Sequence, residues 1–133
     1  WLGQIELALE LMIDRAQKRF SHGSLLSEKQ GIQWLIADSG MELYAAKLMV
    51  LHAAYRIENK LPFKTEVSYC KHHVANTLWR VIDRAVQIAG GRGVLQGDLL
   101  AELYMAIRPL RIYEGASEVQ QVVIARGLFG GRE

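Results

Sequence analysis

Apolar residues recur at every third or fourth position along most of the chain, with polar residues between them. This spacing predicts amphipathic α-helices, and the strict alternation that is typical of β-strands is almost absent. In the first helix, for example, Ile5, Leu9 and Met12 mark the stripe that we expect to be buried. The pattern predicts three long helices and two shorter ones, over residues of about 3–20, 28–58, 65–89, 99–108 and 117–128.

Polar and glycine-rich segments predict where these helices begin and end. Ser27 with Gln30 three positions later has the pattern of a capping box, and Thr65 and Ser117 are suitable N-cap residues. The glycine-rich run 90–93 is expected to end the third helix. Long helices joined by short connections predict an all-α fold, an antiparallel (up-and-down) helical bundle.

Length and composition limit what the chain can be. Its 133 residues are 50% hydrophobic and 23% charged, which is typical of one folded domain with a real core. A net charge of +2 is too small to indicate a nucleic-acid partner. The single cysteine, Cys70, excludes an internal disulfide, and no apolar run is long enough for a membrane span. Because the chain opens on an apolar, helix-like stretch without methionine, we expect a fragment of a longer protein.

Other residues give weaker indications. His72 and His73 are adjacent on a predicted helix and would point about 100° apart, so no metal site is predicted. Leu48 and Leu51 fall off the main apolar stripe of their helix. An isolated bundle would expose them, so we expect surfaces that meet other domains or subunits.

The segment IYEGASEVQ, residues 112–120, carries the clearest candidate chemistry. It places Glu114 next to Gly115 on a turn just before a predicted helix. A carboxylate on such a turn can face a cleft instead of a packed interior, which suits a general base. The alternative interpretation is a solvated glutamate on a capped loop.

Three segments together resemble the C-terminal helical domain of the acyl-CoA dehydrogenases. The resemblance covers essentially the whole chain, and it implies that residues 1–133 form this domain of a protein with an N-terminal helical domain and a middle β domain. It also implies FAD-dependent α,β-dehydrogenation of an acyl-CoA thioester in fatty acid metabolism, usually by a homotetramer. The segments are QIAGGRG (87–93), IYEGASEVQ (112–120) and VIAR (123–126), supported upstream by Gly3, Leu9, Arg19, Gly23 and Gln30.

The resemblance assigns roles to individual residues. Glu114 matches the base that abstracts the α proton while a hydride passes to FAD, and Gly115 permits close approach of the substrate. Arg19 matches an arginine that reaches the FAD diphosphate of a neighbouring subunit, and Gln30 matches a glutamine that contacts flavin. The other cofactor-binding residues that it implies are Gln87, Ile88, Ala89, Gly90, Gly91, Ala116, Ser117 and Glu118, with no metal.

The resemblance also implies partners, and it leaves alternatives open. The expected electron acceptor is electron-transferring flavoprotein or a similar protein, and the expected compartment is the bacterial cytoplasm or the mitochondrial matrix. The alternatives are an acyl-CoA oxidase domain and a non-catalytic module for oligomerisation or flavin binding. His22 and Ala116 stand where the family usually has phenylalanine and threonine, which implies an altered contact to the adenine end of the cofactor and one hydroxyl contact fewer to the flavin. The isolated fragment is expected to be inactive.

Overall fold

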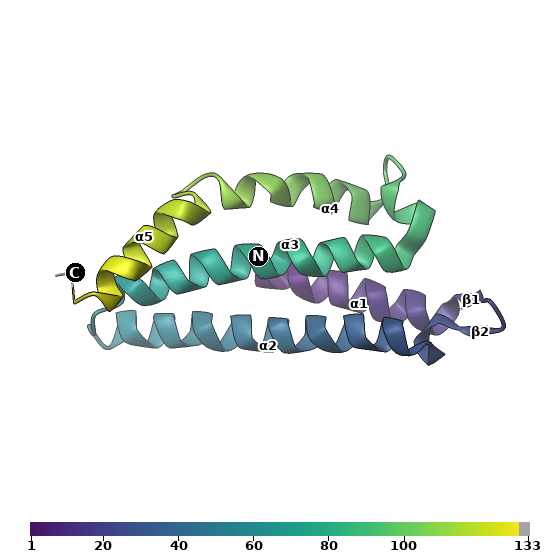
Figure 1. The fold of residues 1–133 in the computed structure, drawn as a ribbon, viewed down its shortest axis with the longest axis horizontal. Helices are drawn as coiled ribbons and strands as arrows, with labels where there is room; N and C mark the ends of the chain where they lie inside the picture. The colour runs from purple at the N-terminus through teal and green to yellow at the C-terminus, as the bar shows by residue number, and fades with distance from the viewer. Residues whose placement is uncertain (131–133) are drawn as a thin grey trace.

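A computed structural model describes residues 1–130 of the chain, and most of these residues lie in five α-helices (Figure 1). Each of the first three helices runs antiparallel to the one before it, and the last two return along the other side of the third. The helices are α1 (Leu2–Lys18), α2 (Gln30–Glu58), α3 (Lys64–Ala89), α4 (Leu99–Ile107) and α5 (Ser117–Leu128). Between them lie β1 (Phe20–Ser21), β2 (Ser24–Leu25) and the short 3₁₀ helices η1 (Leu26–Glu28), η2 (Gly90–Val94) and η3 (Arg108–Arg111).

Helix α3 is the centre of the bundle, because it packs against α1 and α2 on one side and against α4 and α5 on the other. A helix with neighbours on both sides needs a wide apolar surface, and α3 has one. Leu78 and Ile82 are completely buried there, and each such side chain contributes about 1.5–3 kcal/mol to folding. The buried apolar residues of α3 are Val74, Ala75, Leu78, Val81, Ile82, Ala85, Ile88 and Ala89.

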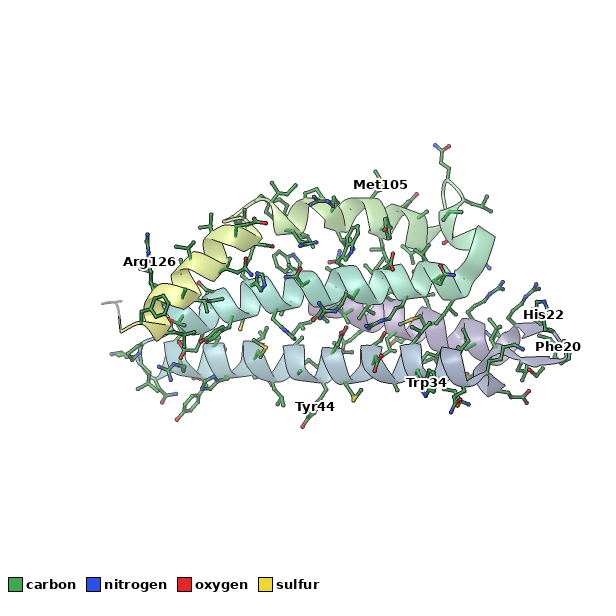
Figure 2. All side chains as sticks on the ribbon, in the orientation of Figure 1. Phe20, His22, Trp34, Tyr44, Met105 and Arg126 are labelled. Carbon is green, nitrogen blue, oxygen red and sulfur yellow. The ribbon has the colours of Figure 1, made fainter. Side chains whose placement is uncertain are left out.

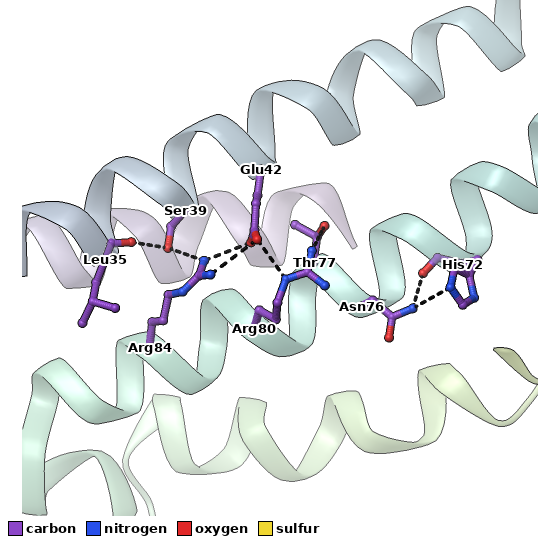
Figure 3. Close-up of polar contacts among 8 residues, drawn as sticks. All are labelled: Leu35, Ser39, Glu42, His72, Asn76, Thr77, Arg80 and Arg84. Atoms are coloured by element: carbon purple, nitrogen blue, oxygen red, sulfur yellow. Dashed lines mark hydrogen bonds and ion pairs between the residues drawn. The ribbon is translucent and has the colours of Figure 1, made fainter.

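A cluster of polar side chains joins α2 to α3 within this packed structure (Figure 3). Arg80 and Arg84 of α3 both donate hydrogen bonds to the carboxylate of Glu42, with N–O distances of 2.9 Å. Arg84 also donates to the buried hydroxyl of Ser39, which in turn donates to the carbonyl oxygen of Leu35. The cluster therefore satisfies the polar groups that the packing of α2 on α3 removes from water.

The predicted bundle is confirmed, but three predicted N-caps are wrong. Ser27 lies in η1, where the backbone N–H of Leu25 donates to the carboxylate of Glu28. Phe63 holds the N-cap position of α3, one residue before the helix begins and two before Thr65. At α5 the extended backbone that an N-cap requires belongs to Ala116, so Ser117 is the first helical residue.

Two local features were not predicted from the pattern. Asp98 caps α4 by accepting a hydrogen bond from the backbone N–H of Leu100 at 3.0 Å. Strands β1 and β2 form a hairpin whose turn residues His22 and Gly23 both have positive φ angles. Two-residue strands are too short to show an alternating pattern. Among residues 1–130, no helix has the length and apolar character needed to cross a membrane.

Candidate functional site

The turn between η3 and α5 has an unusual backbone at its centre. Glu114 and Gly115 both lie in the left-handed region, with φ angles of 52° and 87°. Glycine adopts this conformation freely, whereas for a residue with a Cβ it costs about 1–2 kcal/mol. A glutamate held in this way indicates that surrounding contacts fix the turn.

Two side chains from neighbouring elements supply these contacts. The ammonium group of Lys71 donates to the carbonyl oxygens of Gly115 at 2.8 Å and Leu110 at 2.9 Å. The side-chain amide of Gln120 lies 3.4 Å from the carbonyl oxygens of Glu114 and Gly115. Burial lowers the pKa of Lys71, while the nearby carboxylate of Glu114 acts in the opposite direction. The turn is therefore fixed through its backbone, and the side chain of Glu114 remains exposed.

Lys71 and Gln120 were not identified as site residues from the sequence, although Lys71 has a visible signal. It lies three positions after Ser68, three before Val74 and four before Ala75, all of which are buried. A lysine on the buried stripe of a helix requires polar partners, because burying an unpaired ammonium is costly. Gln120 has no comparable signal in the pattern.

A polar cleft of about 340 Å³ opens beside this turn, between α3, η3 and the start of α5. Four residues that line it each have a buried polar atom without a partner in the described part of the chain. Ser117 is one of them, with a side-chain hydroxyl at the N-terminus of α5. Buried polar groups normally have partners, so these atoms indicate a place for water or for a polar ligand group. The four atoms are His72 Nδ1, His73 Nε2, Arg111 Nε and Ser117 Oγ.

The remaining predicted cofactor residues gather at the other end of α3, beside the β1–β2 hairpin (Figure 1). Arg19 follows α1 and Gln30 begins α2, and both side chains are exposed. Gln87 lies sixteen residues after Lys71 along α3, which is about 24 Å at the helical rise. The structure therefore separates the predicted site residues of one chain into two groups: residues 114–118, and Arg19 with Gln30 and residues 87–91.

Within residues 87–91 only some groups are accessible to a ligand. Ile88 and Ala89 are buried in the core, so their side chains are not accessible to a ligand. Gly90, at a φ of 68°, and Gly91 have open space where a side chain would stand. An extended molecule with a diphosphate, such as FAD, can therefore approach this backbone closely. No cluster of histidine, cysteine, aspartate and glutamate suited to a metal ion occurs among residues 1–130.

Comparison with known proteins agrees with this arrangement of helices and glycines. The family model described as "Acyl-CoA dehydrogenase, C-terminal domain" matches residues 1–129. The chain belongs to the acyl-CoA dehydrogenase C-terminal domain family. The resemblance identified from the two glycine-containing motifs is thus confirmed.

Individual members of the acyl-CoA dehydrogenase family give the same result. Acryloyl-CoA reductase (NADH) of Anaerotignum propionicum is 36% identical over 125 residues, which are 94% of this chain and 32% of that protein. Subunit CarC of the caffeyl-CoA reductase-Etf complex of Acetobacterium woodii is 36% identical over 124 residues, 93% of this chain and 33% of that protein. Butyryl-CoA dehydrogenase of Megasphaera elsdenii superimposes with a TM-score of 0.92 at 31% identity, over 96% of this chain and 33% of that one. The chain spans about a third of the length of these relatives.

Proposed function

We propose that this chain is the C-terminal domain of an FAD-dependent enzyme that α,β-dehydrogenates an acyl-CoA thioester, with Glu114 as the catalytic base. The observation that carries the proposal is the fixed, left-handed turn that presents an exposed carboxylate on a domain of this family. A merely solvated glutamate would not need a strained backbone conformation held by a half-buried lysine. A rigid turn keeps a base at one position relative to a bound substrate.

In this proposal Glu114 accepts the proton from the α carbon of the thioester. FAD, when bound, accepts the hydride that leaves the β carbon. A carboxylate in water is too weak a base for such a proton, so it needs a surface that removes water from it. We propose that the cofactor, the substrate and the rest of the complete protein provide that surface. We propose that Gly115 meets the substrate through its backbone, because the side-chain amide of Gln120 occupies the space where a Cβ would stand.

The turn and the start of α5 would hold one part of FAD. The N-terminus of α5 carries a partial positive charge, and Ser117 has a buried hydroxyl that lacks a partner among the described residues. Ala116 and Glu118 adjoin it at the same helix end. Hydrogen-bonding groups of the cofactor are suitable partners for these positions.

The second group of residues would serve the FAD of a neighbouring subunit. Gln87 lies about 24 Å along α3 from Lys71, which contacts the turn. Arg19 and Gln30 lie at the same end of the bundle as Gln87. The guanidinium group of Arg19 suits a diphosphate, and the open backbone of Gly90 and Gly91 permits its close approach. Two subunits would then complete each cofactor site between them.

An exposed apolar face on α2 supports such an assembly. Trp34, Met41, Leu48 and Tyr55 recur every seven residues, and Tyr44 and Leu51 lie between them; we call these six residues the α2 stripe. Figure 2 shows Tyr44 pointing away from the rest of the bundle, and between 49% and 67% of each residue is exposed. Apolar residues with a seven-residue repeat are typical of a surface that packs against another helix. We propose that the α2 stripe packs against a second copy, as part of a homodimer or homotetramer.

Both of the relatives compared above by sequence are named as reductases, and this favours a second candidate: the same chemistry in the reverse direction. Glu114 would then give its proton to the α carbon of an unsaturated thioester. One of these relatives is a subunit of a complex with Etf, which supports electron-transferring flavoprotein as the redox partner of the complete protein. The location in the bacterial cytoplasm or the mitochondrial matrix stays a prediction.

The proposed function can be tested in the complete protein with Glu114→Gln. Glutamine keeps the size of the side chain and cannot accept the proton. We expect the variant to keep its yellow flavin, while the rate of flavin reduction by butyryl-CoA under nitrogen falls by about 10³-fold or more. Glu58→Gln, an exposed substitution at the end of α2, is the matched control and should reduce its flavin at the normal rate.

The outcomes separate the alternatives. An unchanged rate in Glu114→Gln would show that the base lies elsewhere, and a wild-type protein that binds flavin without being reduced would indicate a non-catalytic module. Rapid reoxidation of the reduced flavin in air would indicate an oxidase. Oxidation of reduced flavin by crotonyl-CoA, faster than its reduction by butyryl-CoA, would favour the reductase direction.

A further inference from the structure

Lys71 lies in the third turn of the central helix and extends to the turn that carries Glu114. Its position on α3 is flanked by the buried residues Ser68, Val74 and Ala75. From there its ammonium group reaches two backbone oxygens that are 39 and 44 residues away in the sequence, those of Leu110 and Gly115. The lysine thus connects the core of the bundle with both ends of the segment 110–115.

Few other contacts hold the middle of this segment. The backbone N–H groups of Ile112 and Tyr113 both donate to the carbonyl oxygen of Pro109. After this, helical hydrogen bonding resumes where the backbone N–H of Gln120 donates to the carbonyl oxygen of Ala116. In the segment between these bonds, the side-chain amide of Gln120 contacts the carbonyl oxygens of Glu114 and Gly115 at 3.4 Å, and contacts of this length are weak. The two bonds from Lys71, at 2.8 and 2.9 Å, are the short ones.

The positive charge of Lys71 suits this position. An ammonium group has three donors and no acceptor, and bonds from a charged donor are stronger than those from a neutral one. Two of the donors go to the carbonyl oxygens of Leu110 and Gly115. On a third side, the nitrogen lies 5.9 Å from the centre of the Trp1 ring, within the range of a cation–π contact. Contacts from η3, the turn and the start of α1 therefore fix the ammonium group in one place.

We infer that Lys71 is a positioning residue for the proposed reaction: it bridges the carbonyl groups of Leu110 and Gly115 and thereby holds Glu114 in the conformation in which it meets the substrate. The inference rests on the proposed function of Glu114. Lys71 itself does not touch the reacting atoms. Its removal should therefore leave binding of cofactor and substrate largely intact and slow the proton-abstraction step, since small misplacements of a catalytic group cost about 10²-fold in rate.

The test uses the complete protein with its FAD and compares Lys71→Met with Lys71→Arg. Methionine keeps the length and apolar stem of the side chain without a donor, and arginine keeps the charge and the donors. Lys47→Met, which removes a lysine paired with Glu6 on the surface, is the matched control. Flavin content, thermal stability, the dissociation constant of butyryl-CoA and the rate of flavin reduction at saturating substrate are measured for each.

For Lys71→Met we expect a reduction rate about 10²-fold below normal, with flavin retained and the dissociation constant within about threefold. Lys71→Arg should reduce its flavin about tenfold faster than Lys71→Met, and Lys47→Met should reduce it at the wild-type rate. A normal rate in Lys71→Met would overturn the inference, as would a loss of activity that only follows a loss of flavin. If Lys71→Met does not fold, a folded Lys71→Arg with normal binding and a lowered rate supports the inference, and a normal rate in it overturns it.

Glu114→Gln, measured alongside, separates this inference from the proposed function. If Glu114→Gln reduces its flavin at the normal rate, the proposed role of Glu114 is wrong, irrespective of the result for Lys71→Met. A slow Glu114→Gln together with a normal Lys71→Met overturns only the role of Lys71.

Discussion

The guanidinium group of Arg84 in α3 donates a hydrogen bond to the carboxylate of Glu42 in α2, with 2.9 Å between Nη1 and Oε2. The side chains of Arg84 and Glu42 are only 19% and 23% exposed, so much of this ion pair is removed from water. Arg80 donates to the other oxygen of the same carboxylate. One glutamate therefore pairs with two arginines between the two longest helices.

Replacing this glutamate should destabilise the bundle. Glu42→Ala leaves Arg84 without its carboxylate in a half-buried position, and we expect the free energy of unfolding to fall by about 2 kcal/mol, between the values for exposed and fully buried pairs. The measurement is urea denaturation of the complete protein. Asp14→Ala, which breaks an exposed pair with Lys18 on α1, is the control and should cost about 0.5 kcal/mol or less. Equal losses in the two variants would contradict the role of the cluster.

Gly115→Ala should disturb the turn in two ways. The φ angle of 87° is strained for any residue with a side chain, and a Cβ at this position would overlap the side-chain amide of Gln120. We expect the variant to lose more than about 1 kcal/mol of stability and to reduce its flavin more slowly, because the backbone of the turn is strained and the amide of Gln120 is displaced from its contacts with the turn.

A second glycine separates these two effects. Gly97 has a φ of 84° and nothing near the position of an added Cβ, so Gly97→Ala introduces the strain without the overlap. We expect it to cost about 1 kcal/mol of stability and to leave the rate of flavin reduction unchanged. If both variants reduce flavin at the normal rate, crowding at Gly115 has no catalytic effect.

His73 should make the stability of the protein sensitive to acid. Burial, and to a lesser degree the charge of Arg80, lowers the pKa of His73 below its usual 6.5, while Glu42 opposes the shift. As the pH falls through 6.5, the unfolded chain takes up a proton before the folded chain does. The contribution of His73 to stability is thus fully present above pH 6.5 and is lost as the pH falls through the lowered pKa.

The test for His73 is the melting temperature at several values between pH 7.5 and pH 5. His73→Gln should show a smaller decrease across this range than the wild type. His52→Gln, at an exposed position on α2, should follow the wild type. If the melting temperature of His73→Gln falls with pH as much as that of the wild type, other groups cause the acid sensitivity.

Much of the fold could be predicted because the apolar residues of its helices follow the helical period over many turns. Ile5 and Met12 were expected on the buried stripe of α1, and both are fully buried. The caps were harder to predict, because Ser27, Thr65 and Ser117 suit an N-cap by type but the path of the chain decides which residue has the extended backbone. At α5 that residue is Ala116, and the hydroxyl of Ser117 is buried instead.

The candidate site could be predicted only where its residues are close together in the sequence. Glu114 and Gly115 were found as one motif, and the structure adds that both have left-handed backbones. Lys71 contacts this turn from 44 residues away, and nothing in the local pattern indicates which carbonyl oxygens it meets. The separation of Arg19 and residues 87–91 from the turn likewise depends on how α3 spans the bundle.

Association of the complete protein should depend on the α2 stripe. Leu48 and Leu51 are 49% and 65% exposed and lie near its middle, so a double substitution Leu48→Glu and Leu51→Glu places two negative charges where a second helix would pack. Unpaired charges in such a contact are costly, and we expect the dissociation constant of the oligomer to rise at least about tenfold. Sedimentation velocity over a range of concentrations measures this change.

The control for the stripe is Leu128→Glu at the end of α5, where a leucine of similar exposure lies on a different helix. This variant should associate like the wild type, because its charge lies outside the proposed contact. If the double variant keeps the mass of the wild type at every concentration, the α2 stripe is not the surface between copies. If the contact also completes the cofactor sites, as the separation of Arg19 from Glu114 implies, the dissociated double variant should lose FAD in parallel with its mass.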